Sequence, residues 1–301
     1  MRLFQIIGTK QIDLAKAFVL VTIASFTVIL SSCSKDLIYF PKSVQEEVEK
    51  TLDNGYDGIV VCVNLDSQIK LYAAGWNNRE HQIPANPNVL FKIASISKLY
   101  IAAATVKLIQ DEQLTLNQTL AELIPEVSDR IEYADGITLE MLLQHRTGIP
   151  EFIYDPEFAN SDPQESYLET ATLIFDKKAD FKPGKKYRYS NTNYLLIGEI
   201  LDRTLGYSHH EYIKSEILQP LHLENTYNQL SEVDSSKVMS GYYVGYEEDL
   251  KMNDYTRPGG SMIASAEDVS LFLRALINGS LLSEEEQEIY SSVYEYEHTG
   301  W

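Results

Sequence analysis

Hydrophobic and polar positions change their spacing along the chain. From about residue 45 to Gly75 the pattern is strand-like: residues 58–65 form a β-rich apolar run and residues 69–73 alternate. This predicts two strands joined by a turn at Asp66-Ser67. From about Ser95 to Asp111, apolar residues recur at the spacing of one helical face, which predicts a long helix. The residues of that face are Leu99, Ala102, Ala103, Val106 and Ile109.

The helical character continues to roughly Tyr246, with a second clear helix predicted over residues 193–205. Ser265 resembles a helix-capping residue before an amphipathic segment that reaches Asn278. The aromatic tail from Tyr290 reads as the beginning of a strand. The order predicts an α/β (α+β) protein, with an α/β part from about 46–95 and 255–301 and an all-helical part, about 96–254, inserted between them.

The first 32 residues have the character of a secretion signal. Arg2, Lys10 and Lys16 precede an uncharged apolar run, 17–30, that is short for a membrane-spanning helix of about 20 residues. Its end, Leu30-Ser31-Ser32-Cys33, resembles a bacterial lipobox. We therefore expect a signal peptide over 1–32, lipidation at Cys33, a tether over 33–45 and a bacterial cell-envelope location. A plain signal peptide and an uncleaved anchor are the alternatives.

Composition and cysteine content argue against several classes of partner and site. The formal net charge of −19 argues against a nucleic-acid partner, since phosphate binding needs clustered Lys and Arg. With Cys33 lipidated, Cys62 has no partner for an internal disulfide, and its apolar surroundings predict a small buried core residue. We find no convincing zinc spacing and expect no metal or cofactor. His209-His210 is interpreted as a solvated loop pair.

The first candidate catalytic motif is Ser-x-x-Lys, which occurs at Ser32/Lys35, Ser67/Lys70 and Ser95/Lys98. Residues three apart are neighbours on a helix but point to opposite faces of a strand. The first pair straddles the expected cleavage site, and the second runs from a turn into a strand. Only Ser95/Lys98 opens a predicted helix, so Ser95 is the candidate nucleophile. The alternative is that Ser95 only begins the helix.

Two further motifs follow in order. Tyr189-Ser190-Asn191 is expected on a loop after Pro183-Gly184, and His298-Thr299-Gly300 lies near the end of the chain. The first could merely shape a loop, and His298 could be a surface histidine. No Gly-x-Ser-x-Gly elbow is present, which disfavours an α/β-hydrolase.

In this order the motifs resemble those of the serine β-lactamase-like family, the hydrolases related to class C β-lactamases and D-alanyl-D-alanine carboxypeptidases. The resemblance covers roughly residues 45–301. It rests on segments that look like the nucleophile region, a loop of the helical part, the second motif with its flanks, and a later structural block. These are residues 91–98, 142–150, 183–198 and 259–272.

This resemblance implies a β-lactamase/transpeptidase-like fold, with an antiparallel sheet flanked by helices and an inserted helical region. Ser95 would form an acyl-enzyme, and Lys98 and Tyr189 would share the removal of its proton. Asn191 would hydrogen-bond the substrate amide, while His298 and Thr299 would help hold the substrate or support Tyr189. The backbone N–H groups of Ser95 and Trp301 would form the oxyanion hole.

The family pattern continues beyond Trp301 with further strands and a C-terminal helix. We therefore expect the chain to be a fragment, with a natural, poorly stable truncation as the alternative. The leading hypothesis is a cell-envelope serine hydrolase acting on a D-alanyl peptide, a β-lactam or a small ester. The second is a non-catalytic binding or sensing protein, and the third a purely structural lipoprotein. The sequence indicates neither the substrate among these nor the oligomeric state.

Overall fold

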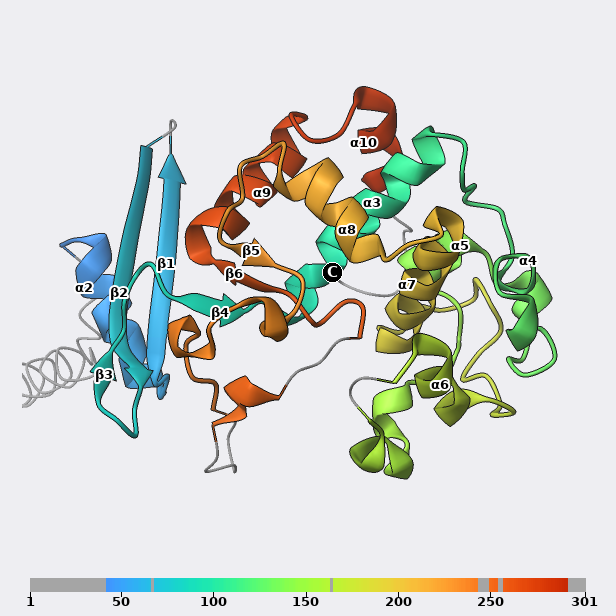
Figure 1. Ribbon diagram of the computed structural model, residues 1–301, viewed down its shortest axis with the longest axis horizontal. Helices are drawn as coiled ribbons and strands as arrows, with labels where there is room; N and C mark the ends of the chain where they lie inside the picture. Colours follow the sequence, from blue (N-terminus) through green and yellow to red (C-terminus); the bar gives the residue numbers. More distant parts are fainter. Residues whose placement is uncertain (1–41, 66–67, 163–164, 243–248, 254–256, 292–301) are drawn as a thin grey trace, which may run out of the picture. The chain divides into compact units, whose positions relative to one another are not determined.

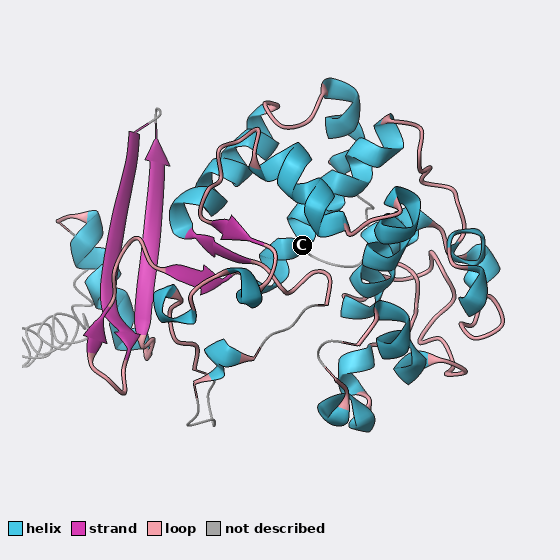
Figure 2. Ribbon diagram, viewed as in Figure 1, coloured by secondary structure: helices cyan, strands magenta, loops and turns pink. Residues whose placement is uncertain are grey.

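The computed structural model describes residues 42–65, 68–162, 165–242, 249–253 and 257–291. The strands are β1 (Gly58–Leu65), β2 (Gln68–Asn78), β3 (Ile83–Pro84), β4 (Leu90–Lys92), β5 (Thr226–Tyr227) and β6 (Ile263–Ser265). Figures 1 and 2 show a hairpin of two long strands, β1 and β2, together with shorter strands and many helices. The helices are α2 (Val44–Thr51), α3 (Ser97–Gln110), α4 (Leu120–Leu123), α5 (Leu139–Leu143), α6 (Tyr167–Ala171), α7 (Asn191–Leu205), α8 (His209–Ile213), α9 (Ala266–Asn278) and α10 (Glu284–Tyr290).

The first sheet is an antiparallel hairpin of β1 and β2, extended by the short β3. Its register runs without a break from Leu65 opposite Gln68 to Gly58 opposite Gly75, which confirms the two predicted strands. The expectation of strand character from about residue 45 was wrong, because 44–51 form α2. Cys62 is only half-buried, not a core residue. In the described chain β1 lies at the edge of this sheet, and none of its residues is fully buried.

A second antiparallel sheet has the order β4-β6-β5. Phe91 lies opposite Ala264, and Thr226 lies opposite the same residue from the other side. These strands of two or three residues were not predicted, since so short a segment shows no periodicity. β5 also falls inside the region expected to be all-helical. The sheet brings residues 90–92 beside residues 263–265, and so sets the entry into α3.

The helix that carries Lys98 is α3, which follows a single 3-10 turn at Ala94–Ile96. The α-helix therefore begins at Ser97, two residues later than predicted. α3 packs against α7, α8 and α10 (Figure 1). Its Tyr100 ring is fully buried and stacks on Phe272 of α9, with 3.6 Å between the centroids. This stacking buries a large aromatic area at the centre of the main hydrophobic cluster.

α9 begins where its sequence signal predicted: the Ser265 hydroxyl accepts a hydrogen bond from the Asp268 N–H. The expectation of a strand from Tyr290 is wrong at that residue, which ends α10; the rest of the tail lies outside the described residues. The fold class is confirmed as a mixture of helices and antiparallel sheets. Within the part described, no helix is both long and apolar enough to cross a membrane.

Candidate active site

Ser95 lies on the exposed 3-10 turn between β4 and α3. The turn is tied down at both ends: the Ile93 N–H bonds the Met262 carbonyl at 3.1 Å, and the Ser97 hydroxyl donates to the Ala94 carbonyl at 2.6 Å. Ala94 has φ of +45°, a left-handed conformation that L side chains rarely adopt. Such strain persists only where the surroundings enforce it. The fold therefore holds Ser95 in one orientation, facing solvent.

Lys98 points toward Ser95 from the first turn of α3. Its side chain is 4% exposed, and its ammonium has three acceptors. They are Ser95 Oγ at 3.3 Å, Asn191 Oδ1 at 2.8 Å and the Gly259 carbonyl oxygen at 2.8 Å. A buried charge is tolerated only when it is hydrogen-bonded in this way. The helix spacing predicted from Ser-x-x-Lys therefore places the amine beside the hydroxyl.

Tyr189 approaches the same hydroxyl from the loop before α7. Its phenol donates a hydrogen bond to Ser95 Oγ at 2.7 Å, and the Lys98 ammonium lies 5.1 Å from the centre of its ring. The side chain is 44% exposed, so solvent and substrate can reach it. Ser95 Oγ thus contacts two groups that can exchange a proton with it.

Asn191 lies at the beginning of α7 and not on a loop, as its motif had suggested. Its side-chain oxygen accepts from Lys98, while its N–H groups face Glu151: the backbone N–H and the side-chain Nδ2 both donate to Glu151 Oε2. Glu151 was not identified from the sequence, although it directly follows the 142–150 segment. Its carboxylate fixes the orientation of Asn191, with the oxygen toward Lys98.

His145 packs against the Tyr189-Ser190-Asn191 motif. Its Nδ1 accepts the Ser190 N–H at 3.2 Å, and its ring lies 4.6 Å from that of Tyr189. Burial, aided by the positive charge of Lys98, lowers the pKa of His145 to about 4. The imidazole is therefore neutral at pH 7, as an accepting Nδ1 requires. The sequence placed this histidine in a family-like loop but assigned it no role.

The structure brings together Ser95, Lys98, Tyr189 and Asn191. The predicted roles of Cys33, His298, Thr299 and Trp301 fall outside the described residues. The interpretation of His209-His210 as a solvated loop pair was wrong. His209 belongs to α8, is 0% exposed, and its Nδ1 lies 2.7 Å from Asp202 Oδ1. Among the described residues there is no cluster of His, Cys, Asp or Glu that could hold a metal ion.

Several known proteins are similar to this chain. Protein flp of Staphylococcus aureus (strain COL) is 25% identical over 240 residues, which are 77% of this chain and 48% of that protein. The chain thus spans about half the length of the curated relatives it matches.

Among solved structures, the octameric penicillin-binding protein homologue from Pyrococcus abyssi is 28% identical with a TM-score of 0.70, covering 80% of this chain and 57% of that one. The D-amino acid amidase from Ochrobactrum anthropi SV3, complexed with D-phenylalanine, shares the fold at 21% identity and a TM-score of 0.71, covering 81% and 72%. A family model described as Beta-lactamase matches residues 43–299. The chain belongs to this Beta-lactamase family of serine hydrolases.

Proposed function

We propose that the protein is a cell-envelope hydrolase that acts through an acyl-enzyme on Ser95, with a D-alanyl peptide, a related D-amino acid amide, a β-lactam or a small ester as substrate. The observation that carries this proposal is the double contact of Ser95 Oγ, at 2.7 Å from the Tyr189 phenol and 3.3 Å from the Lys98 ammonium. A serine hydroxyl becomes a competent nucleophile when an adjacent group takes its proton.

In the proposed reaction, the Tyr189–Lys98 pair takes the proton of Ser95 Oγ as that oxygen attacks the substrate carbonyl. The Oγ–C bond forms and the carbonyl oxygen becomes an oxyanion. The pair then returns the proton to the leaving nitrogen or oxygen as its bond to the carbonyl carbon breaks. Water hydrolyses the resulting ester and regenerates Ser95. The neutral His145 and the Glu151–Asn191 contact would hold the participating side chains in place.

The substrate class is supported by resemblance and by the neighbours. One structural neighbour is titled a D-amino acid amidase and another a penicillin-binding protein homologue. Both names fit a carbonyl that carries an amide nitrogen. The lipobox-like residues 30–33 support the envelope location. It is tested by expressing the protein in bacteria and measuring its partition into detergent, which Cys33→Ala should abolish.

The test of the function is intact-mass spectrometry after incubation with a reactive penicillin, beside a Ser95→Ala control. An adduct on the wild type that is missing from the control supports the proposal, and release of the adduct with time supports hydrolysis. A stable adduct without release favours the binding or sensing alternative only when a D-alanyl peptide, a D-amino acid amide and an activated ester are not cleaved either. If a demonstrably folded wild type forms no adduct with a penicillin and cleaves neither a D-amino acid amide nor an activated ester, the proposal is wrong.

A further inference from the structure

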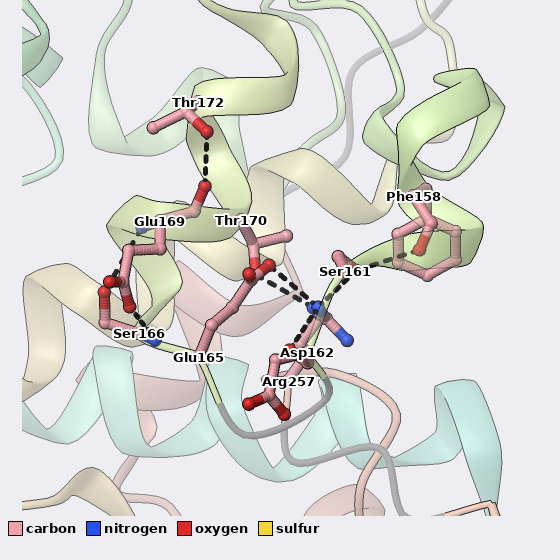
Figure 3. Close-up of polar contacts among 9 residues, drawn as sticks. All are labelled: Phe158, Ser161, Asp162, Glu165, Ser166, Glu169, Thr170, Thr172 and Arg257. Carbon is pink, nitrogen blue, oxygen red and sulfur yellow. Dashed lines mark hydrogen bonds and ion pairs between the residues drawn. The ribbon is translucent and has the colours of Figure 1, made fainter.

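A buried guanidinium lies two residues before the carbonyl that holds Lys98. Arg257 is 6% exposed, and two of its three guanidinium nitrogens, Nε and Nη2, donate hydrogen bonds. Nε donates to Thr170 Oγ1 at 2.9 Å, and Nη2 donates to Ser161 Oγ, the Asp162 carbonyl and Glu165 Oε1 at 2.9, 3.1 and 3.0 Å (Figure 3). A buried charge is costly unless it is paired and hydrogen-bonded. These four hydrogen bonds therefore fix the position of the Arg257 side chain.

The guanidinium also lies against an aromatic ring. Its Cζ is 5.3 Å from the centre of the Phe158 ring. Arginine suits such a site because its planar fork combines several hydrogen bonds with stacking, which lysine cannot reproduce. The polar pocket that receives Arg257 is formed by Ser161 and Asp162, which follow the 3-10 turn at Pro156–Asn160, and by Glu165 and Thr170 at α6. These elements belong to the helical region, far in sequence from residue 257.

Residues 257–259, which we call the strap, then run from this pocket to the candidate active site. Pro258 packs on Gly198 of α7 so closely that a Cβ at Gly198 would lie 2.1 Å from Pro258 Cγ. Gly259 has φ of +82°, and a Cβ there would lie 3.0 Å from Lys98 Cγ. The backbone of the strap thus rests directly on the lysine. Its Gly259 carbonyl accepts the Lys98 ammonium at 2.8 Å.

We infer that Arg257 is a positioning residue for acyl transfer: it anchors the strap so that the Gly259 carbonyl holds Lys98 against Ser95. The inference rests on the proposed function of the Ser95/Lys98 pair. A carbonyl that moves away removes one of three acceptors from a buried ammonium. The amine then no longer points at Ser95 Oγ in the same way. If Arg257 only stabilised the fold, its replacement would leave the direction of the Lys98 amine unchanged.

The test compares Arg257→Gln and Arg257→Lys with Arg203→Gln in the full chain. Arg203 is a matched control, because its guanidinium also bonds carboxylates, those of Glu126 and Glu199, but on the outer side of α7. The measurements are the urea unfolding midpoint and the rate of Ser95 acylation by a reactive penicillin at saturation. The apparent binding constant of the penicillin is determined in the same series.

We expect Arg257→Gln to slow acylation at saturation roughly tenfold or more, with little change in the apparent binding constant. Arg257→Lys should recover only part of the rate, and Arg203→Gln should match the wild type. Ser161→Ala is the second variant, used if Arg257→Gln does not fold. It removes one bond to Arg257 together with the bond from Ser161 to the Phe158 carbonyl, and we expect it to slow acylation about fivefold.

Wild-type rates in a folded Arg257→Gln variant overturn the inference. So do wild-type values in Ser161→Ala when Arg257→Gln does not fold. A wild type that is never acylated at Ser95 is a different outcome: it removes the proposed function and the inference with it.

Discussion

Replacement of Gly198 by alanine tests how tightly the strap is packed. Gly198 lies inside α7, where alanine normally stabilises a helix by about 1 kcal/mol relative to glycine. Here the added methyl would lie 2.1 Å from Pro258 Cγ and 2.7 Å from Pro258 Cβ. The proline ring cannot rotate away as a flexible side chain would, and the strap is held by Arg257 on one side and Gly259 on the other. The helix or the strap must therefore move.

The gain in helix propensity and the cost of overpacking oppose each other, and their sizes decide whether Gly198→Ala stabilises or destabilises the protein. Overpacking of a well-packed site costs about 1–3 kcal/mol, and a contact this short puts Gly198 toward the upper end. After subtracting the gain of about 1 kcal/mol in helix propensity, we expect a loss of about 1–2 kcal/mol in the free energy of unfolding. A displaced strap should also slow Ser95 acylation.

Urea unfolding of Gly198→Ala beside Gly136→Ala measures the effect. Gly136 is a suitable control because its φ is not positive and a Cβ there would meet nothing within 4 Å. We expect the control to stay within about 0.5 kcal/mol of the wild type. A Gly198→Ala protein that equals or exceeds the wild type in stability refutes the close packing of Pro258 on α7.

Two further predictions concern the site. Burial lowers the pKa of His145 to about 4 from the usual 6.5, so between these pH values the unfolded chain binds more protons than the folded one and stability rises with pH. The free energy of unfolding should therefore fall between pH 7 and pH 5, and by about 2 kcal/mol more in the wild type than in His145→Gln. If both proteins lose the same unfolding free energy over this pH range, the imidazole of His145 is not buried in its neutral form. Gly259→Ala places a methyl 3.0 Å from Lys98 Cγ at a left-handed φ of +82°, so stopped-flow acylation should be roughly tenfold slower or worse; an unchanged rate would show that the strap yields without moving Lys98.

Local patterns predicted the features that depend on near neighbours in the chain. The hairpin of β1 and β2, the helix after Ser95 and the Ser265 cap all follow from periodicity or from contacts within a few residues. The proximity of Ser95 to Lys98 belongs to the same group, because one helical turn brings residues three apart together. Motif order added the association of Tyr189 with this pair only through resemblance to a family.

Tertiary structure alone decided what depends on distant segments. β4, β5 and β6 are strands only because they pair with one another, and His209 is buried only because α8 packs into the core. Glu151 reaches Asn191 across 40 residues, and Gly259 reaches Lys98 across 161. No short pattern marks such residues, since their neighbours are determined by packing of the whole domain. The sequence therefore identified the groups that can react, whereas the fold determined which carboxylate, carbonyl and buried guanidinium hold them in place.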